Sequence, residues 1–313
     1  MADKPVNPPV ELTRSEAEII LQQWLGQAVR CRGLRPLTGG CVNTVIEVHF
    51  DHSLSPVVFK MAHGPGFGEG EHAILDFYRK NTRFPVPEPY FYDTSASELP
   101  YSYLIMQRLP GENMGSASRW MNSSDRLQVE RQIAEAVAEL HTYTRERFGG
   151  FREQGSDLPW GEQFQRSVLR EYRRAEATGL LSSETQRKVL RLIEQIPRVL
   201  EAPAKPTLVH GDIWATNIMV DHTQQGAMLS GFLDARGFYA HPEFELAYLE
   251  IWHTVGPTFF EVYTQTHPLV EGYEVRRLFY WLNTLLIHVH YFKEQYYVSA
   301  TENLTKQLAK MFL

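Results

Sequence analysis

The stretch Leu208-Val-His-Gly-Asp-Ile-Trp-Ala-Thr-Asn217, followed by Phe232-Leu-Asp234, decides the fold of this chain. It places Asp212 and Asn217 on one short loop and a second carboxylate, Asp234, at the end of an apolar run. Phosphoryl transfer from a nucleotide needs such a set, because one carboxylate orients the acceptor hydroxyl while an amide oxygen and another carboxylate hold magnesium against the phosphates. The stretch therefore predicts Asp212 as the catalytic residue and Asn217 and Asp234 as metal ligands.

The spacing within this loop is typical of a kinase. An Asp followed five residues later by Asn, and then by the short apolar strand Ile218-Met-Val220, is the pattern of a kinase catalytic loop. Gly211 stands where protein kinases usually have Arg, which favours the branch of the fold that acts on small molecules. A polar turn between two strands would use the same residue types. We count His210 with the catalytic group, where it is expected to support the loop through hydrogen bonds rather than to transfer a proton.

An upstream lysine and glutamate are candidates for binding the nucleotide phosphates. Lys60 ends an apolar strand, and Glu71 lies eleven residues later on a predicted helix. A Lys–Glu pair between strand and helix is how kinases fix the ammonium on the α- and β-phosphates. Strand-end lysines are common, so the assignment depends on the catalytic loop, and Glu69 is the competing partner for Lys60.

A glycine pair precedes Lys60 in the run Thr38-Gly-Gly-Cys-Val-Asn-Thr44. A double glycine is often only a hairpin. In this place it predicts the loop that covers the phosphates, where Gly39 and Gly40 let backbone N–H groups approach the nucleotide. The run lacks the GxxxxGK[S/T] pattern, which argues against a P-loop NTPase.

The run Met106-Gln-Arg-Leu109 follows a predicted strand and precedes Pro110-Gly111. As a hinge between lobes, it would pair backbone groups of Gln107 and Leu109 with the adenine edge and place Met106 at the back of the pocket. The alternative is an ordinary strand end.

Two further residues are candidates for the acceptor side of the site. Trp214 is a large aromatic residue inside the catalytic loop, and it either packs on a neighbouring helix or offers a flat apolar platform to a sugar ring. Arg236 follows Asp234 by two residues. The favoured interpretation makes it an ion-pair partner of Glu243 or Glu245, and the alternative places it against an acidic group of the substrate.

The composition fits an ordinary globular protein. The 313 residues are more than a single hydrophobic core usually contains, and they suit two lobes. Apolar residues make up 43% of the chain and charged residues 22%, as in ordinary globular proteins. The net charge of −6 argues weakly against a nucleic-acid partner. Without an apolar run of about 18 residues, and with a polar, proline-rich N-terminus, we expect neither a membrane span nor a signal peptide. Cys31 and Cys41 form no disulfide framework, so the expected compartment is the cytoplasm.

Periodicity divides the chain into a β-rich part and a helical part, which predicts an α+β fold with two lobes. Residues 1–11 are expected to be a disordered tail, 12–110 the N-lobe with the glycine-rich loop and the nucleotide lysine, and 111–313 the helical C-lobe with the catalytic loop and the acceptor site. The capping-box pattern Thr13-Arg-Ser-Glu16 predicts the start of the first helix. Further helices are predicted over 68–80, 125–148, 160–178 and 182–200, and three more, over 242–255, 257–266 and 273–295, are expected to close the chain.

Several of these motifs resemble those of the fructosamine kinases (ketosamine 3-kinases), a branch of the aminoglycoside-phosphotransferase-like, protein-kinase-like fold. His210-Gly-Asp-Ile-Trp-Ala-Thr-Asn217 resembles the family's HGDLWxxN, and Phe238-Tyr-Ala-His-Pro-Glu-Phe-Glu-Leu-Ala247 its FYGHxEFxLA run. Phe67-Gly-Glu-Gly-Glu71 with Phe84-Pro-Val-Pro87 is similar to its FExE helix and VPxP exit, and Gly39-Gly-Cys41 to its glycine-rich loop. The resemblance extends from about residue 15 to 310.

The resemblance implies ATP and Mg²⁺ as cofactors and a sugar-amine as acceptor. That acceptor is a fructosamine or ribulosamine, free or attached to a protein amine, and its phosphorylation implies a role in deglycation repair. An aminoglycoside or choline kinase is the first alternative, because the negative charge suits a cationic substrate. A pseudokinase-like nucleotide-binding protein is the second.

Departures from the family lie near the acceptor side. Ala235-Arg236-Gly237 replaces the Pro-Ala that usually follows the magnesium Asp, and His288 and His290 lie where the family has Asn and His. His288 is therefore a further substrate candidate. Similar family members carry a cysteine at the position of Cys41 that can cross-link two subunits. Cys41 is therefore expected to be redox-sensitive, and the chain to be a monomer or a homodimer.

Overall fold

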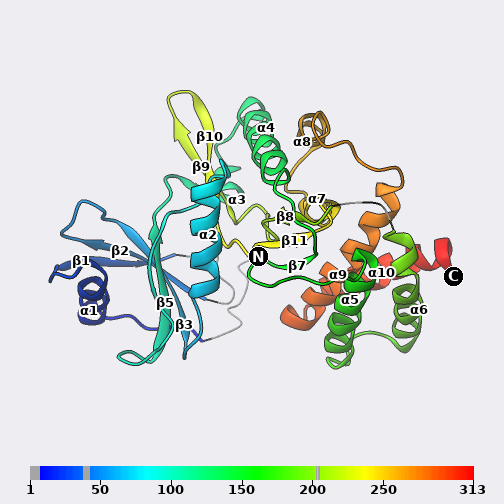
Figure 1. Ribbon diagram of the computed structural model, residues 1–313, viewed down its shortest axis with the longest axis horizontal. Coiled ribbons are helices and arrows are strands. Elements are labelled where there is room, and N and C mark those ends of the chain that lie inside the picture. Colours follow the sequence, from blue (N-terminus) through cyan, green and yellow to red (C-terminus); the bar gives the residue numbers. More distant parts are fainter. Residues whose placement is uncertain (1–7, 38–42, 202, 204) are drawn as a thin grey trace. The chain divides into compact units, whose positions relative to one another are not determined.

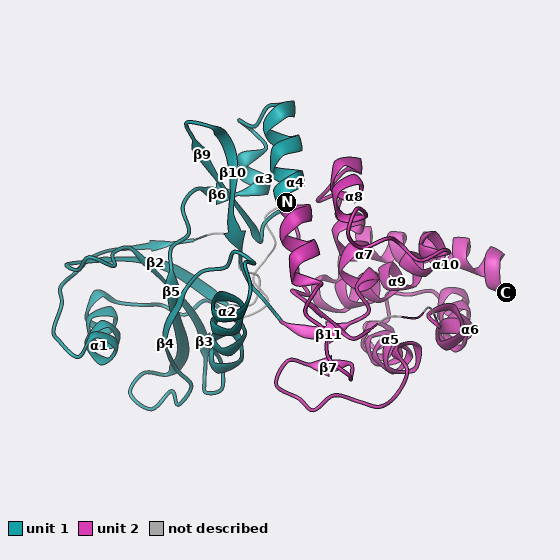
Figure 2. Ribbon diagram, turned by 45° about the horizontal axis from the view of Figure 1, so that its top comes forward, with its two compact units in different colours: residues 1–132, 215–236 teal, residues 133–214, 237–313 magenta. Residues whose placement is uncertain are grey.

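The computed structural model describes residues 8–37, 43–201, 203 and 205–313 of the chain (Figure 1). The chain divides into two compact units (Figure 2). Unit 1 comprises Met1–Gln132 and Ala215–Arg236, and unit 2 comprises Ile133–Trp214 and Gly237–Leu313. The division thus differs from the boundary at residue 110 that the sequence predicts, and it cuts the catalytic loop between Trp214 and Ala215.

In the described part of unit 1, five strands form an antiparallel sheet in the order β1-β2-β3-β5-β4. Helix α1 precedes the sheet, and helix α2 connects β3 to β4 (Figure 1). The bounds are α1 Arg14–Leu25, β1 Cys31–Pro36, β2 Thr44–Phe50, β3 Val57–His63, α2 Glu69–Asn81, β4 Pro89–Asp93 and β5 Tyr101–Gln107.

The N-terminal segment is anchored to this sheet. Thr13 caps α1, and Glu16 returns a hydrogen bond to its backbone N–H, as the capping-box pattern predicts. The expectation of a disordered tail over residues 1–11 fails at Val10, whose side chain is only 4% exposed in the core with Ile20 and Leu21. The N–H of Val10 also donates to Thr44 Oγ1 at 2.7 Å. Residues 1–7 lie outside the described part of the chain.

A second antiparallel sheet explains why the segment after the expected hinge belongs to unit 1. It joins β10 (Gly226–Phe232), β9 (Ile218–Thr223) and β6 (Glu112–Asn113). Gly111 enters this sheet with φ of +80°, and a Cβ there would lie 2.0 Å from the carbonyl oxygen of Val220. Only glycine fits so close an approach, and the residues after it, α3 (Met114–Ala117) and the start of α4 (Ser123–Leu140), continue in unit 1.

Unit 2 is mostly helical, around a core drawn chiefly from α5, α6, α9 and α10. The small sheet β7-β11-β8 has β8 at the start of the catalytic stretch, where the sequence indicates β structure, and adds β7 and β11, which the sequence did not predict. The bounds are β7 Gly149–Gly150, α5 Trp160–Glu176, α6 Ser183–Val199, β8 Thr207–Val209, β11 Phe238–Ala240, α7 Glu243–Ile251, α8 Pro257–Tyr263, α9 Tyr273–Phe292 and α10 Gln295–Phe312.

Four helix predictions in this part of the chain need correction at their C-terminal ends, and the helices expected over 242–255 and 257–266 end at Ile251 and Tyr263. The helix expected over 125–148 ends at Leu140, although its apolar stripe, Val129, Ile133 and Val137, is fully buried as the periodicity indicates. The helix expected over 273–295 ends at Phe292, because Lys293 takes a left-handed conformation with φ of +56°. A further helix, α10, then closes the chain.

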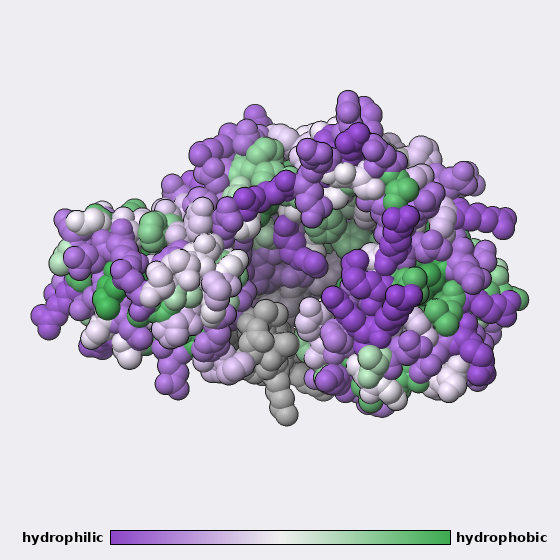
Figure 3. All heavy atoms as spheres, turned by 60° about the horizontal axis from the view of Figure 1, so that its bottom comes forward, coloured by the Kyte–Doolittle hydropathy of each residue, from purple (hydrophilic) through white to green (hydrophobic). Residues whose placement is uncertain are grey.

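Polar side chains prevail on the face that Figure 3 shows, and apolar ones form scattered patches. Among the described residues, no helix combines the length and the apolarity that crossing a bilayer requires.

Candidate active site

An ion cluster around a buried lysine lies in unit 1. Lys60 is on β3, which pairs with β2 and β5 inside the sheet, and its Nζ donates to Glu71 of α2 at 2.8 and 2.6 Å. Nζ also donates to Asp234 Oδ1 at 2.7 Å. Burial alone would lower the pKa of Lys60, but the two carboxylates outweigh it and raise the pKa, so the ammonium stays charged. The partner of Lys60 on α2 is thus Glu71 and not the competing Glu69.

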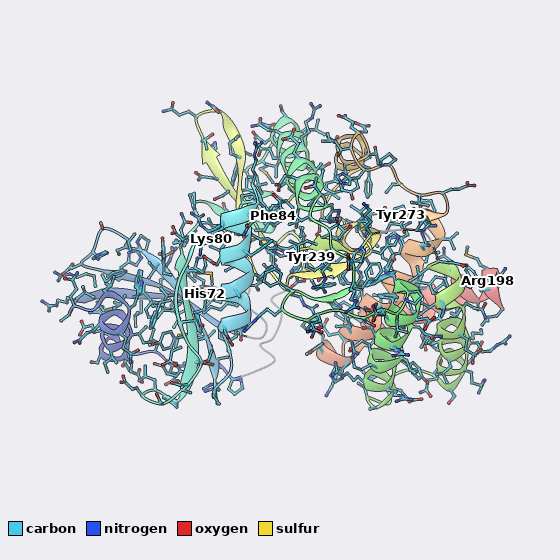
Figure 4. The ribbon with its side chains drawn as sticks, viewed as in Figure 1. His72, Lys80, Phe84, Arg198, Tyr239 and Tyr273 are labelled. Atoms are coloured by element: carbon cyan, nitrogen blue, oxygen red, sulfur yellow. The ribbon has the colours of Figure 1, made fainter. Side chains whose placement is uncertain are left out.

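Asn217 and Asp234 flank the open end of the β9–β10 hairpin. Leu233 N–H donates to the carbonyl of Asn217 at 2.8 Å, next to the Ile218–Phe232 register pair, so the hairpin brings the two predicted ligands together. Phe232 stacks on Phe84 with ring centroids 4.4 Å apart, and Figure 4 shows Phe84 beyond the C-terminal end of α2.

The backbone of Asp234 is held in an uncommon conformation. Its φ is +61°, a left-handed value that Asp adopts more readily than most residues, and its side chain is 39% exposed. Asn217 is 6% exposed. An amide oxygen and a carboxylate oxygen are hard donors, and two protein donors suit Mg²⁺, which keeps several waters and takes phosphate oxygens as well. Within the described residues no cluster of three or more His, Cys, Asp or Glu is placed to hold a metal.

The predicted adenine segment ends strand β5. Met106 is buried, and the N–H of Gln107 donates to the carbonyl of Glu88 at 2.8 Å. That N–H is therefore already used, and adenine recognition by this segment would rely on its other backbone groups. Gly39, Gly40 and Cys41 lie outside the described residues.

A buried carboxylate that the sequence did not indicate binds Arg108 of the Met106–Leu109 segment. Glu47 of β2 accepts hydrogen bonds from Arg108 Nε at 2.8 Å and Arg35 Nη2 at 2.7 Å, and its other oxygen is 2.8 Å from His49 Nε2. Burial works to raise the pKa of Glu47, but these three neighbours lower it to about 2. Arg108 also donates to the carbonyls of Leu109 and Gly111. A glutamate in an alternating strand predicts a solvent-facing side chain, so the pattern gave no signal for this contact.

In unit 2, one buried carboxylate holds the backbone of the catalytic loop. Glu245 of α7 accepts from the N–H of His210 at 3.0 Å and of Gly211 at 2.6 Å. Burial works to raise the pKa of Glu245, but His141, whose Nε2 lies at 3.3 Å, and the loop amides hold it below its usual range. The N–H of Asp212 donates to His210 Nδ1 at 3.2 Å. His210 thus supports the loop by a hydrogen bond to the residue that carries the predicted base.

The glycine in this loop has a steric cause. Gly211 has φ of +87°, and a Cβ built on it would lie 2.3 Å from Cε1 of Phe238 in β11. An L side chain at this position meets both a strained backbone and an aromatic ring. The Arg of protein kinases is therefore excluded here by space.

The side chain of Asp212 has a partner that the sequence did not indicate. The hydroxyl of Tyr248 on α7 donates to Asp212 Oδ1 at 2.6 Å. Glu245 and Tyr248 are three residues apart on one helix, so they share a face. Tyr248 comes directly after the 238–247 run that resembles the family motif, and only three-dimensional contact reveals its role.

The structure also places the remaining substrate candidates. Trp214 is half-buried and belongs neither to the apolar core of unit 2 nor to any ring pair among the described residues. Arg236 is exposed. The two carboxylates expected to pair with it have other partners, since Glu243 binds Arg276 at 2.6 and 2.7 Å and Glu245 holds the loop amides. His288, on α9, is half-buried and donates from Nδ1 to the carbonyl of Thr284 at 2.7 Å.

The fold is protein-kinase-like, and the chain is an ATP-dependent small-molecule kinase. The chain belongs to the fructosamine kinase family, whose model matches residues 14–310.

Relatives and solved structures are similar along most of the chain. A probable ketoamine kinase of Enterococcus faecium is 28% identical over 281 residues, which cover 83% of this chain and 90% of that protein. The chloroplastic protein-ribulosamine 3-kinase of Arabidopsis thaliana is 24% identical over 298 residues, which cover 90% of this chain and 85% of that one. The aminoglycoside phosphotransferase APH(4)-Ia, solved with AMP-PNP and hygromycin B, shares the fold with a TM-score of 0.67 at 16% identity, over 94% of this chain and 97% of that chain.

Proposed function

We propose that this protein transfers the γ-phosphoryl group of ATP to a hydroxyl of a ketosamine, the sugar of a fructosamine or ribulosamine. The observation that carries the proposal is the Lys60 ammonium held between Glu71 and Asp234, because it is a charged donor fixed for nucleotide phosphates. Membership of the fructosamine kinase family and similarity to a protein-ribulosamine 3-kinase support the choice of acceptor.

Each residue has a definite task in this reaction. Lys60 binds the α- and β-phosphates, and Glu71 keeps its ammonium charged and oriented. Asn217 and Asp234 would hold Mg²⁺, which when bound neutralises charge on the transferring phosphoryl group. Asp212 orients the acceptor hydroxyl and takes its proton as the oxygen attacks phosphorus. Glu245 and Tyr248 hold the backbone and the side chain of this loop in place.

Trp214, Arg236 and His288 are our candidates for contacts with the acceptor. Trp214 is half-buried outside the core, which supports its role as a platform for the sugar ring. The negative net charge favours a cationic sugar-amine. We extend the proposal to ketosamines attached to proteins. Phosphorylation there would destabilise the adduct and so begin its removal.

A panel of acceptors tests the proposal. ADP release is measured with Mg²⁺-ATP and a fructosamine, a ribulosamine, an aminoglycoside, choline, or no acceptor, with Lys60→Met as the inactive control. We expect release that depends on a ketosamine. Turnover of the aminoglycoside or choline alone would favour the first alternative function, and ATP binding without turnover of any acceptor would favour the pseudokinase.

A further inference from the structure

A row of aromatic rings begins at the predicted base and follows the surface of unit 2. Tyr248, whose hydroxyl binds Asp212, lies 6.3 Å from Trp252, and Trp252 lies 4.6 Å from the ring of His288. The ring of His288 is 4.9 Å from that of Tyr297. We call these four residues, at the end of α7, on α9 and on α10, the aromatic row. Each of the four residues is half-buried.

The aromatic row is distinct from the core that holds the helices together. The apolar core of unit 2 includes residues of α5, α6, α9 and α10, and of the row only Tyr297 packs against it. Tyr248 and Trp252 are neither core members nor packed on the core. Large rings that leave part of their surface in water, side by side and outside the core, are typical of a ligand-binding wall.

The place of the row fits one part of the proposed acceptor. In a ketosamine only a few sugar carbons separate the hydroxyls from the amine. The Tyr248 hydroxyl lies 2.6 Å from Asp212 Oδ1, so a sugar hydroxyl bound at Asp212 places the amine and its substituent within reach of the Tyr248 ring. The amine is a cation near neutral pH, and the faces of aromatic rings attract cations. The same faces bury apolar substituents and repel carboxylates.

We propose that the aromatic row receives the amine of the acceptor and its substituent, and that it selects ketosamines whose amine carries an apolar or aromatic group over those that carry a carboxylate beside it. This inference rests on the proposed function. Trp252 is the central ring, because it contacts Tyr248, His288 and Tyr297, the last at 6.3 Å.

The test compares two acceptors, N-benzyl fructosamine and fructosyl-glycine, in the wild type and in Trp252→Leu. We expect the wild type to have a KM for the benzyl acceptor that is several-fold to about ten-fold lower, the range of an added contact between aromatic rings, because the cationic amine is common to both acceptors. Trp252→Leu should abolish most of this preference and leave the KM for ATP unchanged. Tyr297→Leu, on another helix, should reduce the preference in the same direction, and thermal melting verifies that both variants fold.

The matched control is Trp120→Leu in unit 1. Trp120 is also half-buried and stacks on a histidine, His222, at 4.8 Å, but it lies outside the row. This variant should keep the wild-type preference. Turnover of both acceptors without preference, or a preference that survives in folded Trp252→Leu and Tyr297→Leu, would overturn the inference and leave the proposed function standing. Wild-type enzyme that phosphorylates neither acceptor would overturn both.

Discussion

Replacing Tyr248 by Phe removes one hydroxyl and keeps the ring. That hydroxyl donates to Asp212 Oδ1 at 2.6 Å, a charge-assisted hydrogen bond of the kind that contributes about 1.5–3 kcal/mol. The bond favours the ionised carboxylate, which is the form that accepts the proton. Its loss therefore makes Asp212 easier to protonate, so the acid limb of kcat should move to higher pH.

The predicted pH dependence of kcat distinguishes a residue that positions Asp212 from a residue that only stabilises the fold. At pH 8 the carboxylate stays ionised in both enzymes, so kcat should fall only through lost orientation, by about 3- to 30-fold. Near pH 5 the deficit should grow, while the KM for ATP stays constant. The assay is ADP release with the best acceptor of the panel, measured from pH 5 to pH 9.

Tyr172→Phe is the matched control. It removes a phenol–carboxylate hydrogen bond of the same length, 2.6 Å, from Tyr172 to Glu176 on α5. The acid limb of this variant should coincide with that of the wild type. If the acid limb of Tyr248→Phe also stays in place, the phenol does not govern the protonation of Asp212, and the reasoning is refuted.

Four further predictions concern residues of unit 2. Asp212→Asn should keep ATP binding and lose about 10²–10⁴ in kcat, and transfer within a few-fold of wild type would remove Asp212 from the base role. Gly211→Ala should lower both thermal stability and kcat, because the new Cβ meets Phe238 at 2.3 Å; unchanged melting would contradict the strain. His241 has its pKa lowered to about 3, mainly by burial and then by the charges of neighbouring cations. Below about pH 6.5 His241 binds a proton in the unfolded chain but stays neutral in the folded protein. The free energy of unfolding should therefore fall by up to about 1.4 kcal/mol per pH unit down to about pH 3. In urea unfolding, the stability of His241→Asn should depend less steeply on pH. Trp214→Ala should raise the acceptor KM several-fold to tens-fold with the ATP KM unchanged, and no change in either constant would make Trp214 a structural residue.

Local chemistry made much of the fold predictable. The Thr13–Glu16 pattern predicts the start of α1, and the spacing of Lys60 from Glu71 predicts a strand–helix pair that the structure contains. These signals lie within one element or between two successive ones. The family, the fold class and the kinase class followed from the catalytic loop and its neighbours.

Contacts between distant parts of the chain were not predictable. Nothing in the alternation of β2 indicates that Glu47 is buried and bound by Arg108, sixty-one residues away. The pairing of β6 with β9, which assigns residues 111–132 to unit 1, depends on a close backbone approach at Gly111. Arg276, not Arg236, binds Glu243, and the choice between the two arginines is made by the packing of α9.

Helix α7 and its C-cap carry three residues to which we assign a task in the proposed function. Glu245 fixes the amides of the loop, Tyr248 fixes the carboxylate of Asp212, and Trp252 follows at the C-cap, while Arg276 anchors the helix through Glu243. Glu245 and Tyr248, which would align Asp212, and Trp252, which would recognise the acceptor, thus lie in one contiguous segment of the sequence. Changes confined to its last turn offer a route to new acceptors that leaves the alignment intact. Residues 243–252 are accordingly the natural unit to exchange between relatives when acceptor preference is to be redesigned.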